Sequence, residues 1–279
     1  MLQNSFVHLP GIGAETEQKL WDQGLKTWDD LSLNLSRLFG PQKAKKVAFA
    51  LDESQAAHQA GEIKYFQEKF KSAEMWRLLP SLIQKKSAIA YLDIETTGLG
   101  FPPQCQSTTI SVLFKGQLHI EHDRQKKRQL LEQVQTEAEL LVTFNGGTFD
   151  LPFLRREFRL HLRQTHLDLR YWMARLDYKG GLKKVQKAFR EIHQRRSMDI
   201  DGFDAVRLWN LHLRGVPKAL ETLMTYNAED TVVLEQLIYC GLNLEAQRRP
   251  QLGLITYKIP QAPKIPTQVC PFVYRALRN

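Results

Sequence analysis

The feature that most constrains this chain is a short apolar run at residues 88–95, AIAYLDIE, which ends in two carboxylates. The run lies between Lys85-Lys86 and a Thr-Thr-Gly turn, so it predicts a buried strand. Side chains alternate along a strand, and Asp93 and Glu95 are therefore expected on one face at its end. Two such carboxylates repel each other, and sharing a divalent cation relieves the repulsion. A single Asp-x-Glu is common by chance, so its meaning depends on the rest of the chain.

A second buried strand, LLVTFN at 140–145, leads through two glycines to Phe149-Asp150 and then to the helical run LPFLRREF. Pro152 near the start of that run fits the first turn of a helix. Asp150 is thus expected at a strand-to-helix junction, where α/β folds place functional side chains. Asp150 can equally be a helix N-cap, and Asn145 a turn residue.

A third segment, YNAED at 226–230, lies inside a helical pattern whose apolar positions form a buried stripe. Asp230 falls beside that stripe, and Tyr226, four residues earlier, shares its helix face. A carboxylate turned inward is costly unless it is paired or bound to a metal. The alternative is a hydrogen-bonded Tyr and Asp pair near the surface.

Together and in this order, the segments DIETTGL (93–99), NGGTFDLPFL (145–154) and YNAED (226–230) resemble the DEDD 3′ to 5′ exonucleases. The resemblance is to the subgroup with a tyrosine in the third motif, most closely the YprB-type ribonuclease-H-like family, and it spans about residues 88–245. It implies an α/β, RNase H-like fold: a mixed five-stranded sheet with flanking helices, beside a small all-α N-terminal unit. The strands are expected at 88–95, 108–114, 117–122, 140–145 and 166–169.

The same resemblance implies a metal-dependent nuclease that hydrolyses phosphodiester bonds by in-line attack. Four converging carboxylates would need two Mg²⁺ or Mn²⁺ ions, about 3.5–4 Å apart. By resemblance Asp93 would bridge both ions, with Glu95 and Asp230 completing the site of the attacking water. Asp150 would hold the second ion, and Tyr226 would orient the water. Substrate contacts are assigned by resemblance to Leu99, Asn145 and Phe149, with Thr96 in the first motif beside them.

The charge of the chain favours a polyanionic partner. Its formal net charge is +9 and its pI about 9.4. Residues 155–196 hold 13 basic side chains against four acidic ones, and residues 246–279 hold no acid and several prolines. We expect nucleic acid, as single strands or 3′ ends of DNA or RNA, to contact the first segment. A solvated helix face is the plainer interpretation of such a run.

The N-terminal segment LPGIG at 9–13 precedes a helical pattern, with Gly24 as its stop and Thr27 as the cap of the next helix. It resembles a helix-hairpin-helix module, which implies that Gly11, Ile12 and Gly13 form the hairpin and that Gly11 and Gly13 contact phosphate. A plain turn is the alternative. A further helical pattern runs from Lys43 to Leu79, and Pro80 is expected to end it.

We therefore expect four parts: a helix-hairpin-helix-like unit (1–55), a helical linker (56–86), the exonuclease domain (87–245) and a basic proline-rich tail (246–279). Three scattered cysteines argue against a disulfide framework and favour a cytoplasmic location. The sequence shows no membrane-spanning run. Two alternatives remain open: a non-catalytic nucleic-acid-binding protein on the same scaffold, and an RNase H-like endonuclease.

Overall fold

The structure is a computed structural model that describes residues 1–84, 89–193 and 200–277. Three expectations fall partly outside the described residues: the start of the first strand, Arg195 and Arg196 of the basic segment, and the end of the tail. The chain divides into two compact units. The first comprises Met1–Gln84 and Leu242–Tyr257, and the second comprises Lys85–Gly241 and Lys258–Asn279.

The first unit is helical, as its sequence pattern predicts. Thr27 caps the second helix: its hydroxyl accepts from the Asp30 amide, and the Asp30 carboxylate accepts from the Thr27 amide. The expected stop at Pro80 is wrong, because α6 begins at Leu79 and holds the proline in its first turn, where no amide hydrogen is needed. The helices are α1 (Ala14–Asp22), α2 (Trp28–Ser32), α3 (Leu35–Leu38), α4 (Pro41–Gln59), α5 (Ile63–Lys69) and α6 (Leu79–Gln84), with 3₁₀ turns at Leu2–Asn4, Ser72–Leu78 and Pro250–Leu252.

The second unit is built on a mixed five-stranded sheet in the order β3-β2-β1-β4-β5. β1 lies at its centre, antiparallel to β2 and parallel to β4; β3 is antiparallel to β2, and β5 is parallel to β4. The expected fold class is confirmed. The strands are β1 (Ile89–Thr96), β2 (Ser107–Phe114), β3 (Gln117–Glu121), β4 (Leu140–Thr143) and β5 (Thr165–Asp168).

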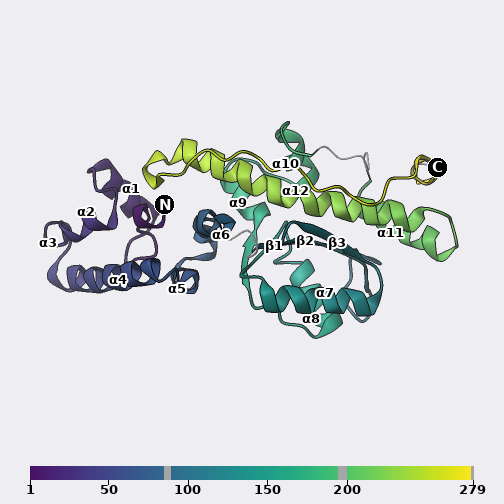
Figure 1. Cartoon of the computed structure of the whole chain (residues 1–279), viewed down its shortest axis with the longest axis horizontal. Helices are drawn as coiled ribbons and strands as arrows, with labels where there is room; N and C mark the ends of the chain where they lie inside the picture. The colour runs from purple at the N-terminus through teal and green to yellow at the C-terminus, as the bar shows by residue number, and fades with distance from the viewer. Residues whose placement is uncertain (85–88, 194–199, 278–279) are drawn as a thin grey trace. The chain divides into compact units, whose positions relative to one another are not determined.

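Helices cover both faces of this sheet (Figure 1). α7 and α8 lie on one face, where Leu92 and Ile94 of β1 pack into an apolar core with Leu131 and Phe153. α12 crosses the other face, and Thr231 on it hydrogen-bonds the Ser111 carbonyl of β2. The helices are α7 (Arg124–Glu137), α8 (Asp150–Phe158), α9 (Leu169–Arg175), α10 (Leu182–Ala188), α11 (Gly202–Leu213), α12 (Ala219–Arg248) and α13 (Pro271–Ala276).

The tail is mostly without regular structure, as its prolines predict, but two helical pieces depart from that expectation. α12 continues to Arg248, and α13 begins at Pro271, which again occupies a first-turn position. In the second unit, the Gln236 amide donates to the Pro260 carbonyl, and the Thr225 hydroxyl donates to Thr267. Among the described residues, no helix has both the length and the apolar character needed to cross a bilayer.

Candidate functional site

The central strand supplies the first two carboxylates. Along β1, Leu92 and Ile94 point into the core beside α7 and α8, so Asp93 and Glu95 must point to the opposite face. Both are half-buried. The strand alternation that follows from the sequence therefore places them together on the face that α12 crosses.

α12 brings a third carboxylate to this face. Asp230 is buried, and one oxygen from each of Asp93, Glu95 and Asp230 lies within 4.8 Å of the others. Tyr226, one helical turn before Asp230, is also buried, at 5% exposure. The structure thus brings together residues 93, 95 and 230, which are far apart in the sequence.

Asn227 holds Asp93 in place, a contact that the sequence analysis missed. Its side-chain amide donates to Asp93 Oδ2 at 2.7 Å, and Asn227 is fully buried. A hydrogen bond donated to a carboxylate favours its charged form and fixes its orientation. The only signal in the sequence was that Asn227 lies three residues before Asp230, a spacing that puts both on one helix face.

Asp150 lies near Asp93 but outside the group of three. It is the first residue of α8, with Phe149 as the N-cap, and it is 6% exposed. Burial raises the pKa of Asp150 well above its ordinary value, and the negative charges of Asp93 and, more weakly, Asp168 raise it further. The backbone amide of Ile94 on β1 donates to the Asp150 carboxylate and opposes this shift. Asp150 is therefore electrostatically joined to the β1 carboxylates.

The loop from Asn145 to Phe149 sets the position of Asp150, and Asp168 holds this loop. Asp168 accepts from the backbone amides of Asn145 at 2.7 Å and Gly147 at 3.2 Å, and it also caps α9. Arg170 Nη1 donates to Asn145 Oδ1 at 2.6 Å. The chain turns sharply here: Asn145 has a φ of +68°, and a side chain at Gly146 would collide with Thr143. Asp168 and Arg170 are positioning residues that the sequence analysis counted only as charges.

The residues expected to contact substrate differ in their surroundings. Leu99 is 77% exposed in the loop after β1. Phe149 packs against Phe101 and Phe153, with ring centroids 5.9 and 5.6 Å away. Thr96 is buried, and its hydroxyl donates to the Gly98 carbonyl at 2.7 Å, so it shapes the loop that presents Leu99.

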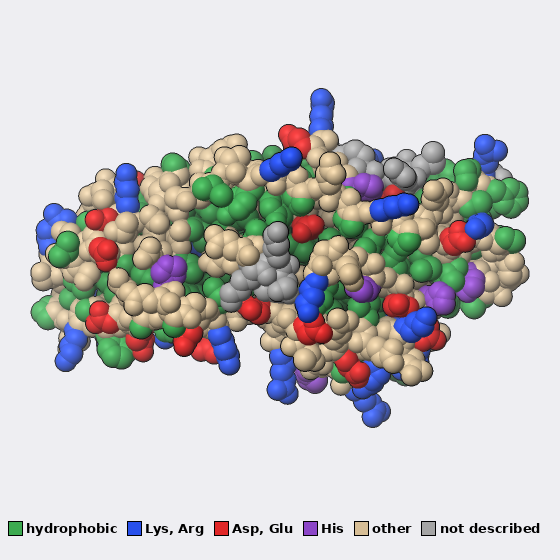
Figure 2. Space-filling view, viewed as in Figure 1, with side chains coloured by type: hydrophobic (Ala, Val, Ile, Leu, Met, Phe, Trp, Pro, Cys, Tyr) green, Lys and Arg blue, Asp and Glu red, His purple; other side chains and the backbone are tan. Residues whose placement is uncertain are grey.

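One basic side chain of the 155–196 segment reaches the tyrosine. The ammonium of Lys183 on α10 lies 5.3 Å from the centroid of the Tyr226 ring. On the face seen in Figure 2, Lys and Arg side chains are interspersed with Asp and Glu and do not merge into one patch. The basic side chains with a contact to a predicted site residue are Lys183, beside Tyr226, and Arg170, which donates to Asn145.

The N-terminal hairpin residues belong to the first unit. Gly11 has a φ of +70° and Gly13 is the N-cap of α1, while Ile12 between them is buried. The Lys43 ammonium donates to the Gly11 carbonyl at 3.1 Å. The described helical piece that precedes this turn is the three-residue 3₁₀ turn Leu2–Asn4.

Comparison with known protein families assigns the chain to a superfamily. A family model for the RNase H superfamily matches residues 90–240, which is more than half of the chain. The chain belongs to the RNase H superfamily. Members of this superfamily are generally hydrolytic nucleases that use divalent metal ions, and the fold implies a nucleic-acid substrate. No curated protein matches the chain.

Proposed function

We propose that this protein is a 3′ to 5′ exonuclease that hydrolyses single-stranded DNA or RNA from its 3′ end with two divalent cations. The observation that carries the proposal is the assembly of Asp93, Glu95 and Asp230 around one point, with Tyr226 one turn from Asp230. Asp150 lies near enough to Asp93 for the negative charge of Asp93 to raise the pKa of Asp150. This combination supports the YprB-type, tyrosine-containing subgroup of the DEDD exonucleases within the superfamily.

The donor set suits Mg²⁺ or Mn²⁺. Both ions prefer carboxylate oxygens, and three such oxygens lie within 4.8 Å of one another. The carboxylates of Asp93, Glu95, Asp230 and Asp150 would hold the ions. Bound there, the ions would activate water and stabilise the developing charge on the phosphate. The partly buried, mutually repelling carboxylates would favour binding of a cation, because the cation would replace the water that they have lost.

The other residues would position the substrate and the water. The hydroxyl of Tyr226 can both donate and accept a hydrogen bond, so it would orient the attacking water. Asn227 would keep Asp93 directed at the reacting phosphate. Lys183 and Arg170 add positive charge beside Tyr226 and Asn145, where a polyanion must approach an acidic centre. Leu99 and Phe149 are the proposed contacts of the terminal base.

The first unit is proposed to bind the nucleic-acid backbone through its helix-hairpin-helix-like turn at Gly11–Gly13. The exposed N-cap Gly13 of α1 supports this, because amide hydrogens at a helix N-terminus attract phosphate oxygens. The basic tail would add further positive charge. The proposed location of the protein is the cytoplasm.

The test uses single strands labelled at the 5′ end, as matched DNA and RNA, with Mg²⁺ or with EDTA. An exonuclease produces a ladder that shortens from the 3′ end, only with the metal. Asp93→Ala is expected to lower the rate about a thousandfold or more and to leave strand binding largely intact. Glu132→Ala, which removes an exposed carboxylate on α7, serves as the matched control.

The same experiment separates the alternatives. Internal fragments from the first time point would identify an endonuclease, and binding without cutting would identify a nucleic-acid-binding protein. Cleavage that survives Asp93→Ala would contradict the assignment of the site.

A further inference from the structure

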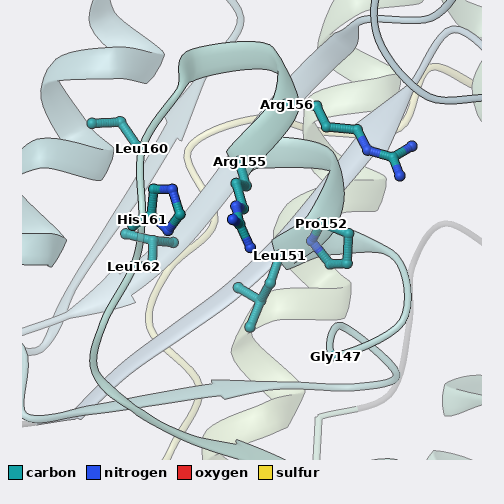
Figure 3. A pocket seen from close by; sticks show the side chains of 8 residues that line it. All are labelled: Gly147, Leu151, Pro152, Arg155, Arg156, Leu160, His161 and Leu162. Carbon is teal, nitrogen blue, oxygen red and sulfur yellow. The ribbon is translucent and has the colours of Figure 1, made fainter.

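A cavity of about 430 Å³ opens beside α8 (Figure 3). On this helix Asp150, Phe153 and Leu154 are buried, whereas Arg155 is exposed and Leu151 is only partly buried. The cavity therefore occupies the face of α8 opposite to Asp150. It is lined by Gly147, Leu151, Pro152, Arg155, Arg156, Leu160, His161 and Leu162.

The lining combines apolar walls with positive charge. Leucine and proline side chains form the walls, and the polar side chains are two arginines and a histidine, with no carboxylate. Arg155 points between Leu151 and His161 (Figure 3). Among the described residues, no carboxylate lies within ion-pair distance of Arg155, so its guanidinium has no protein counterion there. An apolar surface beside a free guanidinium matches a nucleotide, with its flat base and its phosphate.

Two segments connect the lining of the cavity with the elements that carry the proposed reaction centre. Gly147 lines the cavity and belongs to the loop that Asp168 holds beside Asp150. Arg156 lies over the Phe101 ring, 4.2 Å from its centroid, and Phe101 in turn contacts Phe149. To reach Arg155, a strand whose 3′ end lies at the carboxylates would have to pass Phe149 and Gly147 around the N-terminal end of α8. Along the helix axis, Arg155 is about 7.5 Å beyond Asp150.

We propose that this cavity is a subsite for a nucleotide of the bound strand upstream of its 3′ end, with Arg155 binding the phosphate and the leucine walls contacting the base. The proposal rests on the proposed function, because the strand reaches the cavity only if its end lies at the carboxylates. The subsite would make the enzyme prefer strands that are long enough to reach from the carboxylates to the cavity.

The test measures binding of fluorescent oligo-dT of three and twelve nucleotides to the full chain in EDTA, which stops metal-dependent cutting. Arg155→Ala is expected to weaken binding of the 12-mer about tenfold. It should also reduce the slope of log affinity against log salt by about 0.7, the loss of one phosphate contact on a single strand. Binding of the trimer should change less than twofold.

Arg163→Ala is the matched control, because Arg163 is an exposed arginine of the same segment that lies just outside the lining. If both variants weaken the 12-mer equally, or if Arg155→Ala weakens the trimer as much as the 12-mer, the subsite does not exist. Displacement of the 12-mer by free dTMP from the wild type but not from Arg155→Ala would assign the cavity to a released nucleotide and overturn the strand proposal.

These results are independent of catalysis. A chain that cuts no strand but shows the length-dependent loss on Arg155→Ala would contradict the exonuclease proposal and leave the subsite intact. A chain that degrades strands normally in both arginine variants, with unchanged binding, would contradict the subsite alone.

Discussion

Two clusters of charged side chains, one in each unit, are built in opposite ways. In the first unit, Arg77 is buried among opposite charges: it donates to Glu17 at 2.7 Å and to Glu74 at 2.7 Å, and also to the Ser5 hydroxyl. In the second unit, Asp93, Glu95 and Asp230 gather charges of the same sign. The first arrangement is complete within the protein and stabilises the fold. The second places like charges together, an arrangement whose mutual repulsion a divalent cation would relieve.

Among the variants that test this contrast, Arg77→Met is expected to have the largest effect. Removing the guanidinium leaves Glu17, which is 1% exposed, without its ion-pair partner, and should lower the free energy of unfolding of the first unit by about 3 kcal/mol or more. Urea unfolding followed by tryptophan fluorescence reports it, since Trp21, Trp28 and Trp76 lie in this unit. Arg37→Met, at an exposed position, should change it by less than about 0.5 kcal/mol. Equal effects of the two variants would refute the structural role of the buried pair.

The next effect concerns the loop that Asp168 holds. Asp168→Asn keeps the shape of the side chain but weakens its acceptance of the Asn145 and Gly147 amides. We expect a loss of about 10- to 100-fold in Mn²⁺ affinity, measured by titration calorimetry, with a parallel loss in cleavage.

Asp123→Asn is the control for this variant, because Asp123 similarly accepts two backbone amides, at the start of α7 in the same unit. If the two variants affect Mn²⁺ affinity equally, Asp168 acts only on general stability and not on the site.

These particular residues also show how far sequence reasoning extends. The strands, the capping box at Thr27 and the alternation of Asp93 and Glu95 depend on neighbours in the sequence, and local patterns predicted them. Asp168 stands beside the Asn145 loop only because β5 pairs in parallel with β4, which places Thr143 opposite Asp168. Arg77 and Glu17 are sixty residues apart. Such pairings are set by tertiary register, and no local pattern encodes them.

A smaller effect should appear with pH. His8 is buried beside Trp28, Phe66 and Phe70, and its Nε2 is 3.1 Å from the Ser54 hydroxyl. Burial, followed by the positive charges of Arg77 and Lys69, lowers the pKa of His8 to about 3. In the unfolded chain the His8 imidazole binds a proton near pH 6.5, whereas in the folded chain it stays neutral at that pH. Stability from this group is therefore complete above pH 6.5 and decreases as the pH falls toward 3, by up to about 1.4 kcal/mol per unit.

His8→Gln removes this titration. The loss of unfolding free energy between pH 6.5 and 5 should therefore be smaller in the variant by about 2 kcal/mol. The comparison of slopes does not depend on any direct cost of the substitution. Identical slopes in the two proteins would mean that folding does not lower the pKa of His8.

Asp230→Asn is expected to have the smallest effect, but it tests the contrast between paired charges and like charges most directly. Asp230→Asn keeps the volume of the side chain and removes one of three like charges, so in EDTA it should raise the free energy of unfolding of the second unit by roughly 1 kcal/mol. Added Mg²⁺ should stabilise the wild type in proportion to the logarithm of its concentration above the dissociation constant, and the variant much less. The order of stability should therefore reverse with the metal. A variant that is less stable than the wild type in EDTA would show that Asp230 contributes to the fold as Glu17 does, and the contrast between the units would fail.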